Sequence, residues 1–139
     1  MEIGLAQIAA ILRSVKNIAV VGLSPKPERP SYQVAAYLLQ HGYEIVPVNP
    51  NHGEILGRKC FASLTEVPMP VQIVNVFRRS NSVPAIVTAA IQKKVPCVWL
   101  QTGIRHEAAA ASARQHRLIL IQHLCILQMH QQLHVQDYL

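Results

Sequence analysis

The chain has 139 residues, of which 50% are apolar and 14% are charged, and its formal net charge is +6. This length predicts one domain with a substantial core, and the excess of cations favours an anionic partner. A nucleic-acid partner is not favoured, because the sequence has no lysine-rich block, no zinc-finger spacing and few aromatic side chains to stack on bases. A phosphorylated small molecule suits this composition better.

Membrane and secretory signals are missing from the sequence. No run of about eighteen apolar residues is present, and the apolar stretch 5–12 is short and lacks a basic leader. The three cysteines, Cys60, Cys97 and Cys125, are far apart and odd in number. Such spacing favours reduced thiols over disulfides or a zinc site, so we expect a cytoplasmic protein without a bound metal.

The amino-terminal third predicts a helix, a strand and a second helix. Residues 2–15 carry apolar side chains at helical spacing. The short β-branched run 18–21 is typical of a buried parallel strand. A second helix is predicted over residues 32–41, with Ser31 as its N-cap and Gly42 as its left-handed terminator.

The loop between that strand and helix has the features of an anion site. Gly22 ends the strand, and three prolines then stiffen the chain around Lys26 and Arg29. The free N–H groups at the start of the following helix face the same crevice as these two cations. Helix dipole and side-chain charge would together stabilise a phosphate there.

The middle of the chain predicts two further strands and a short helix. The strand 43–48 is followed by the turn cluster 49–53. The segment 55–61 is less regular and is interpreted as a connection. A one-turn helix is predicted over 63–68, before the third strand at 71–77.

The last third continues the alternation of helices and strands. A helix is predicted from 82 to 93, with its proline in the first turn. A strand at 97–100, a helix at 105–115 and a strand at 118–121 follow, and the tail 124–139 is predicted to be helical. The whole pattern predicts one α/β domain over residues 1–139, with an amino-terminal helix within 1–16 and a doubly wound, Rossmann-like, mainly parallel five-stranded sheet in three α/β/α layers.

Polar side chains collect after the predicted strands. Residues 24–31, 49–52, 78–79 and 101–103 each follow the carboxyl end of a strand. Open parallel sheets bind ligands at this edge, where the strand order reverses. The sequence therefore predicts one crevice formed by four loops.

The sequence lacks two marks of a dinucleotide fold. Gly22 is followed by no second glycine, and the second strand ends without a carboxylate, because Glu44 lies at its beginning. A set of cations is available instead, which suits a ligand with additional phosphate such as coenzyme A (CoA). The set is Lys26, Arg29, Arg58, Lys59, Arg78 and Arg79. NADP remains an alternative.

Several short motifs occur in a recognisable order. They are Ile18 to Pro25, Arg29-Pro30-Ser31-Tyr32, Pro47-Val48-Asn49-Pro50, Val76-Phe77-Arg78-Arg79 and Trp99 to Gly103. Over roughly residues 14–125 the chain resembles the small, stand-alone bacterial CoA-binding proteins, which are similar to the CoA-binding domain of the succinyl-CoA synthetase α-subunit. The resemblance implies a Rossmann-like fold with CoA laid over the strand ends.

The resemblance also implies roles for individual residues. The phosphates would contact Gly22, Ser24, Lys26 and Arg29, with Ser31 at the start of the helix. The adenosine would lie against Pro47, Val48 and Asn49, and the rest of the ligand would contact Phe77, Arg78, Gln101 and Gly103. The match weakens near the carboxyl terminus, where the family usually carries Asp-Arg-Cys and this chain has His123-Leu124-Cys125.

We predict a protein that binds CoA or an acyl-CoA at the carboxyl edge of the sheet, in a non-catalytic or accessory role. No nucleophile, base and orienting group occur together at a workable spacing. One alternative is an NAD(P)-dependent oxidoreductase. Another is a degenerate, non-binding interaction protein that forms a homodimer through its apolar tail, with Leu124, Leu127 and Met129.

Overall fold

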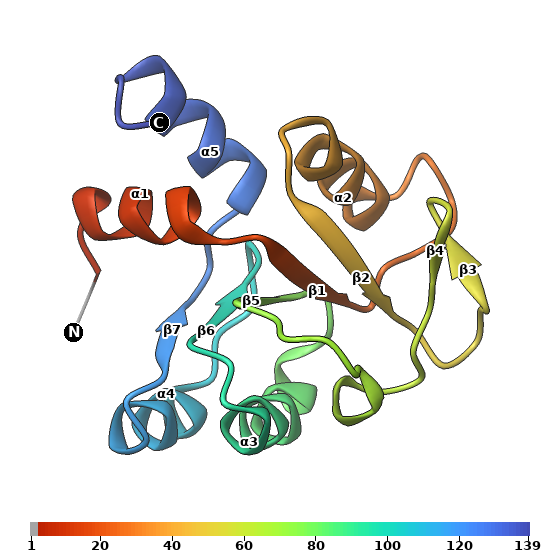
Figure 1. The fold of residues 1–139 in the computed structure, drawn as a ribbon. Helices are drawn as coiled ribbons and strands as arrows, with labels where there is room; N and C mark the ends of the chain where they lie inside the picture. The colour runs from red at the N-terminus through yellow and green to blue at the C-terminus, as the bar shows by residue number, and fades with distance from the viewer. Residues whose placement is uncertain (1–2) are drawn as a thin grey trace.

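The computed structural model describes residues 3–139 and shows a parallel sheet between two layers of helices (Figure 1). The sheet has the strand order β2-β1-β5-β6-β7, and every neighbouring pair is parallel. These strands are β1 (Asn17–Val21), β2 (Glu44–Val48), β5 (Ile73–Val76), β6 (Cys97–Leu100) and β7 (Ile119–Ile121). The predicted Rossmann-like α/β fold is confirmed, and the strand order reverses between β1 and β5.

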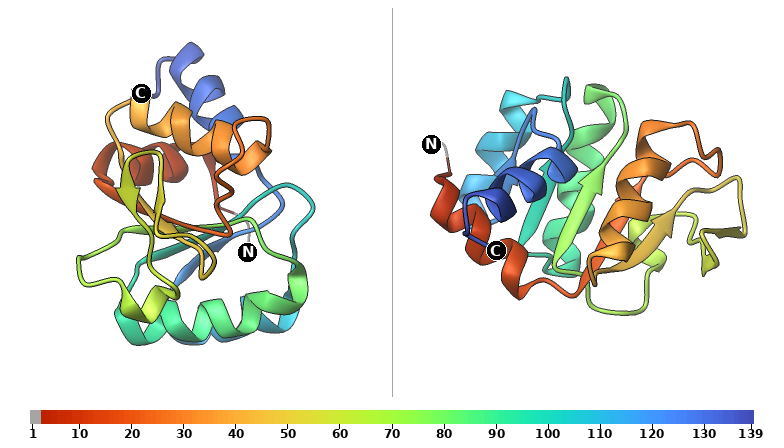
Figure 2. Two further views of the ribbon diagram at one scale, coloured as in Figure 1. Left: turned by 90° about the vertical axis from the view of Figure 1, so that its right-hand side faces the viewer. Right: turned by 90° about the horizontal axis from the view of Figure 1, so that it is seen from above.

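The helices lie on both faces of the sheet (Figures 1 and 2). One face packs against α1 (Leu5–Ser14), α2 (Pro30–Gln40) and α5 (Ile126–Val135). The other face packs against α3 (Val83–Lys93) and α4 (Glu107–Gln115). In residues 3–139 no helix has the length and apolarity needed to cross a bilayer.

The core follows from the alternation of side chains along each strand. In β6, Cys97 and Trp99 belong to the cluster on the α1, α2 and α5 side, whereas Val98 and Leu100 belong to the opposite cluster. All four are at most 1% exposed. A strand buried on both faces reads as an unbroken apolar run, and this is why the sequence pattern identified β6.

The first helix begins later than predicted. The expected beginning at Glu2 lies outside the described residues, and residues 3–4 precede the helix, which begins at Leu5. The helix is tied to the sheet by the hydroxyl of Tyr43, which donates to the carbonyl oxygen of Leu12 at 2.6 Å.

The predicted N-cap of α2 is wrong by two residues. Arg29 occupies the cap position, and Ser31 lies inside the first turn. The ring of Pro30 fixes a helical φ at the first position, so the helix begins before the serine. The predicted end is confirmed, because Gly42 has a φ of +94° and its N–H donates to the carbonyl of Leu39.

A hairpin replaces the irregular connection predicted over residues 55–61. Its strands are β3 (Glu54–Ile55) and β4 (Arg58–Lys59), and its two turn residues, Leu56 and Gly57, both have positive φ. A leucine in that conformation is unusual, so the turn carries no sequence signal. Short 3₁₀ helices η1 (Leu64–Glu66) and η2 (Ser80–Ser82) follow, and η1 lies within the one-turn helix predicted over 63–68.

Within the tail 124–139, which was predicted to be helical, α5 covers Ile126–Val135, and the beginning of this helix is attached to the sheet. The indole Nε1 of Trp99 donates to the carbonyl of Leu124 at 2.8 Å. The side-chain oxygen of Gln101 accepts the N–H of Ile126 at 2.9 Å, which satisfies a free donor at the start of α5. The beginning of α5 is therefore fixed to the carboxyl end of β6.

One buried polar group makes no hydrogen bond within residues 3–139. Asn75 in β5 is 0% exposed, and neither its Oδ1 nor its Nδ2 has a partner there. We expect Asn75→Val to raise the free energy of unfolding by about 1–2 kcal/mol, because an unsatisfied amide leaves the core and a β-branched side chain suits the strand. Urea unfolding checks this, with Asn75→Ala as a control that removes the amide but leaves a void. A valine variant less stable than wild type would contradict the expectation.

Candidate functional site

Gly22 sits where the sheet order reverses, and a larger residue cannot replace it without movement. Its φ is +87°, and an added Cβ would lie 2.5 Å from the carbonyl oxygen of Phe77. Its N–H donates to Val48, and the N–H of Phe77 donates to Val21. The ends of β1, β2 and β5 therefore meet at this glycine.

The loop after Gly22 is held by its own serines. The hydroxyl oxygen of Ser31 accepts the N–H of Ser24 at 3.0 Å, and that of Ser24 accepts the N–H of Lys26 at 3.1 Å. The N–H of Arg29 donates to the carbonyl of Lys26 at 3.0 Å. These bonds and the prolines give the loop a defined shape.

The two cations of this loop are exposed. Within residues 3–139, neither Lys26 nor Arg29 forms an ion pair with a carboxylate. Pro30 has no N–H, and the N–H of Gln33 is already bonded to the carbonyl of Arg29. The earliest N–H groups of α2 therefore add their partial positive charge to that of the two side chains.

Asn49 joins this loop to the one that follows β2. Its Nδ2 donates to the carbonyl of Leu23 at 2.9 Å, and its Oδ1 accepts the N–H of Asn51 at 2.8 Å. The amide thus holds two loops in register at the position where a dinucleotide fold carries a carboxylate.

A cavity of about 470 Å³ lies over these loops, and we call it the loop cavity. It is bounded by both cations, both serines, Asn49 and the beginning of α2. Its full lining is Gly22, Ser24, Pro25, Lys26, Arg29, Pro30, Ser31, Asn49, Asn51, His52, Phe77 and Arg78. Eight of the residues predicted to bind the ligand come together here, and the predicted residues outside this lining are Pro47, Val48, Gln101 and Gly103.

A neighbouring cavity of about 540 Å³ is lined in part by the thiol of Cys125, and we call it the thiol cavity. It shares Pro30, Phe77 and Arg78 with the loop cavity. The lining is Pro30, Val34, Phe77, Arg78, Arg79, Gln101, Thr102, Ile104 and Cys125. The amide of Gln101 is already engaged, since its Nε2 lies 3.9 Å from the sulfur of Cys125 and its oxygen holds α5.

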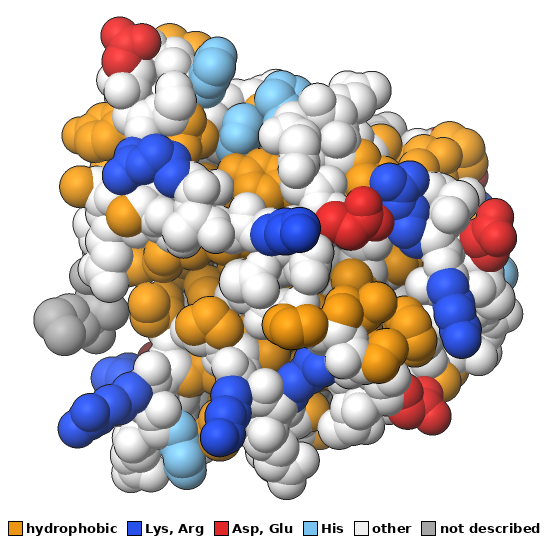
Figure 3. Space-filling model, viewed as in Figure 1, with side chains coloured by type: hydrophobic (Ala, Val, Ile, Leu, Met, Phe, Trp, Pro, Cys, Tyr) orange, Lys and Arg blue, Asp and Glu red, His pale blue; other side chains and the backbone are white. Residues whose placement is uncertain are grey.

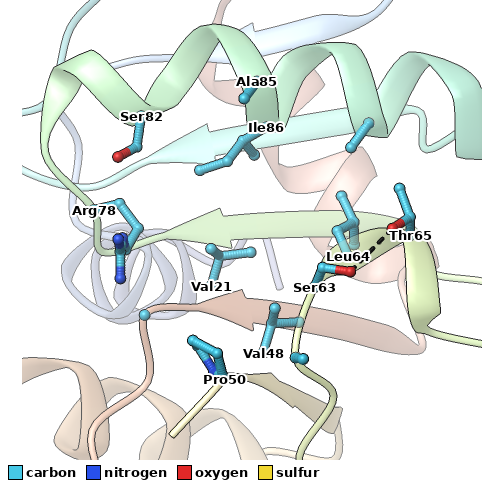
Figure 4. Close-up of a pocket in the computed structure, with 13 residues that line it drawn as sticks. Val21, Val48, Pro50, Ser63, Leu64, Thr65, Arg78, Ser82, Ala85 and Ile86 are labelled. Atoms are coloured by element: carbon cyan, nitrogen blue, oxygen red, sulfur yellow. Dashed lines mark hydrogen bonds between the residues drawn. The ribbon is translucent and has the colours of Figure 1, made fainter.

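A third cavity of about 350 Å³ lies on the α3 side of Gly22, and we call it the apolar cavity. Figure 4 shows Val21 and Val48 at the strand ends, Ile86 projecting from α3, and Ser63 bonded to Thr65. The remaining lining residues are Gly22, Pro50, Ala62, Leu64, Arg78, Ser82, Ala85 and Ala89. Its walls suit a flat, apolar group with polar atoms at its rim.

Arg78 lines all three cavities. It is exposed, and its Cδ would lie 2.9 Å from a Cβ on residue 22. Its neighbour Arg79 lines the thiol cavity only. Arg78 is therefore the cation best placed to contact a ligand that extends across the strand ends.

Two predicted site residues do not line these cavities. Pro47 is buried in β2, opposite Val20, and its carbonyl accepts the N–H of Phe61 at 3.0 Å. Gly103 is exposed with a φ of +86°, and its N–H donates to the Nδ1 of His123 at 2.7 Å. The structure gives both residues a role in shaping loops.

Arg58 does not join the crevice, contrary to its inclusion among the available cations. Its Nε donates to Glu44 Oε2 at 2.9 Å, near the amino end of β2. This hydrogen bond lowers the pKa of Glu44 and raises that of Arg58. Both side chains are about half exposed, so the pair adds little stability.

Some lining residues were missed in the sequence. Asn51 and His52 lie in the turn cluster after β2, and that cluster was a usable signal. Ser63 and Thr65 belong to the beginning of η1 and Ser82 ends η2, short helices without a binding motif, and they reach the apolar cavity because η1 and α3 pack beside the sheet. No sequence pattern would have found them.

The other thiols are structural. Cys97 is 1% exposed, and burial raises its pKa to about 12. Burial also raises the pKa of Cys60. Within residues 3–139 no group of three or more histidine, cysteine or carboxylate side chains is arranged to hold a metal ion.

Comparison with known proteins assigns the chain to a family. The family model described as CoA binding domain matches residues 16–131. The chain belongs to this CoA-binding family. The matched region contains every element that forms the three cavities, from β1 to the first turn of α5.

Relatives of this CoA-binding domain include stand-alone chains and parts of larger proteins. Protein YneT of Bacillus subtilis (strain 168) is 42% identical over 125 residues, covering 90% of this chain and 93% of YneT. A solved structure of a Pyrococcus horikoshii OT3 protein is 37% identical, has a TM-score of 0.91, and covers 94% and 92% of the two chains. The α-subunit of acetate–CoA ligase (ADP-forming) I of Pyrococcus furiosus is 36% identical over 89 residues, which are 60% of this chain and 19% of that subunit.

Proposed function

We propose that this protein binds CoA or an acyl-CoA along the carboxyl edge of its sheet, in a non-catalytic or accessory role. The observation that carries the proposal is that Arg78 joins three adjoining cavities of different character. One has cations and helix N–H groups, one is apolar, and one contains a thiol. CoA has a matching order of parts, with phosphates between an adenine and a pantetheine arm.

The diphosphate would occupy the loop cavity. Lys26, Arg29 and Arg78 supply positive charge around it, and the first turn of α2 supplies N–H donors. Ser24 and Ser31 accept backbone N–H groups through their oxygens, so each retains a hydroxyl hydrogen that can be donated to a phosphate.

The two ends of CoA would enter the neighbouring cavities. The adenine suits the apolar cavity, where Val48 and Ile86 provide opposing apolar walls (Figure 4). The pantetheine arm would cross Phe77 into the thiol cavity, towards Gln101 and Cys125. Each end therefore has a compartment that opens onto Arg78.

The same cavities support binding in preference to catalysis. Among residues 3–139, the side-chain partner of Cys125 is the amide of Gln101, which is neither a base nor an acid. The stretch that aligns with the acetate–CoA ligase subunit is 19% of that subunit, so the activity of the whole subunit is not carried over to this chain.

A thermal-shift series with CoA, NAD, NADP and ATP tests the proposal and its oxidoreductase rival. At a concentration about a hundredfold above Kd, CoA should stabilise the fold by about 2.7 kcal/mol. NAD and ATP should act weakly, because each lacks the pantetheine arm and a 3′-phosphate. Stabilisation by NADP without stabilisation by CoA would overturn the proposal in favour of the rival.

A further inference from the structure

Five aromatic rings meet where α2 packs on α5, and we call them the ring cluster. They are Tyr37 of α2, His41 at the C-cap of α2, Tyr43, and His130 and His134 of α5. Tyr37 stacks on His41 with ring centroids 4.0 Å apart, and His130 lies 5.1 Å from His41 and 6.5 Å from His134. Histidine side chains gather over α5 and α2 at the upper edge of the face shown in Figure 3.

His130 is the buried centre of the cluster. It is 6% exposed, and its Nδ1 is 2.7 Å from the hydroxyl of Tyr37. His41 donates its own Nδ1–H to the carbonyl of Tyr37 at 2.8 Å, and Tyr43 donates to the carbonyl of Leu12. Among residues 3–139, the hydrogen-bond partner of the His130 side chain is the hydroxyl of Tyr37.

The surroundings of His130 disfavour its charged form. Burial lowers its pKa, and the positive forms of His41 and His134 lower it further. From α1, which also packs on α5, the charged group at the helix end is Arg13, bonded to the carbonyl of Tyr138. No carboxylate in residues 3–139 contributes to the pKa of His130, so no opposite charge there offsets a new positive charge on its ring.

The sign of the pH dependence follows from this shift. The pKa of His130 in the folded chain lies below its ordinary value of 6.5. Packing of the neutral ring is therefore fully stabilising above that ordinary value, and the contribution is lost as pH falls from there to the folded-state pKa. Acid should loosen the contact between the two helices.

The ring cluster joins the two helices whose beginnings wall the thiol cavity. Pro30 and Val34 of α2 line it, and so does Cys125, the N-cap of α5. Val34 and His41 are seven residues apart, which is about 10 Å along a helix. The ring cluster and the thiol cavity thus lie between the same two helices, about two turns apart along α2.

We propose that protonation of His130 releases the beginning of α5 from the crevice and thereby weakens ligand binding in the thiol cavity. The binding part of this inference rests on the proposed CoA function. The structural part does not, because α5 carries its own reporter: the protein's single tryptophan, Trp99, is fully buried and donates to Leu124 just before α5.

Trp99 emission and the Kd for CoA should be followed between about pH 7.5 and about pH 5.5, the range in which histidine titrates. In wild type we expect the emission to change with falling pH and the Kd to rise about fivefold or more. In His130→Gln, whose amide oxygen can still accept from Tyr37, the emission should not change, and the Kd should rise only by the part that titration of the ligand itself causes. The phosphates of CoA also titrate in this range and affect both proteins alike. The quantity to follow is therefore the ratio of the wild-type Kd to the His130→Gln Kd at each pH.

Two further variants complete the design. His134→Gln removes an exposed ring whose positive form lowers the pKa of His130, so the emission change should move to higher pH. His116→Gln removes an exposed histidine of α4 that bonds the carbonyl of Ser112 in the same way as His41 bonds its own helix, and it should leave the wild-type profile intact.

An emission change of equal size in wild type and His130→Gln would overturn the proposal, and so would a wild-type emission that stays constant. Absence of CoA binding at every pH would refute the proposed function instead. Trp99 emission would in that case still decide whether protonation releases α5.

Discussion

Gly22→Ala is expected to abolish measurable CoA binding and to lower the free energy of unfolding by roughly 2–4 kcal/mol. The new Cβ would lie 2.5 Å from the carbonyl oxygen of Phe77, at a φ of +87° that alanine adopts only with strain. The turn must move, and the ends of β1 and β5 move with it. Urea unfolding and a CoA titration measure the two effects.

Gly42→Ala is the matched control. Gly42 has a similar φ of +94°, and an added Cβ would meet nothing within 4 Å, at the far end of α2 from the crevice. In Gly42→Ala only the backbone strain should lower the free energy of unfolding, by about 1–2 kcal/mol, and the affinity for CoA should be unchanged. Equal losses in the two variants would show that the close approach of Phe77 does not matter.

Arg78→Ala is expected to weaken CoA binding by about 30-fold, which corresponds to about 2 kcal/mol for a lost charge-assisted contact. The guanidinium borders all three cavities and would contact the phosphates at their junction. The fold should remain intact, because the side chain is exposed and bonded to no other residue in 3–139. Titration calorimetry measures the affinity.

Arg79→Ala tests whether the loss of CoA affinity in Arg78→Ala comes from the position of the lost charge or from the change in total charge. Arg79 is also exposed and adjacent in sequence, but of the three cavities it borders only the thiol cavity. An exposed charge of this kind contributes little to binding, so the affinity of Arg79→Ala for CoA should be lower than that of wild type by about threefold or less. If both variants weaken binding equally, the assignment of Arg78 to the phosphate junction is wrong.

The central strands of the sheet were predictable because their side chains are buried on both faces. Runs such as 18–21 and 97–100 contain only residues that favour a buried parallel strand, and they are separated by helical patterns of the right length. The hairpin formed by β3 and β4 was not predictable. Its turn places Leu56 at a positive φ, and no short-range preference favours that choice.

The residues that line the crevice were predictable only in the loops that follow the carboxyl ends of strands. Topology brings the loops after β1, β2 and β5 to one edge, and motifs in those loops identified Ser24, Lys26 and Arg78. The apolar cavity depends instead on the packing of η1 and α3 beside the sheet, which local patterns do not encode. The sequence therefore indicated a phosphate site but not the compartment beside it.

Residue roles were less predictable than residue positions. Ser31 was expected to cap α2 but holds Ser24, because Pro30 begins the helix first. Arg58 was counted among the crevice cations but pairs with Glu44, since the hairpin carries it to the other end of β2. His106 caps α4, because its ring Nδ1 accepts the N–H of Ala109 at 3.1 Å.

The central claim is that the loop after β1 is a preformed cradle for the diphosphate of CoA. Calorimetric titration of CoA into wild type and into Lys26→Ala/Arg29→Ala tests it most directly. Wild type should show saturable binding that weakens as salt screens the exposed cations, and the double variant should bind weakly with little salt dependence. Lys16→Ala/Arg114→Ala, which removes two exposed charges away from the cradle, should bind like wild type. No heat of binding from folded wild-type protein at low salt, or equal affinity in both double variants, would contradict the claim.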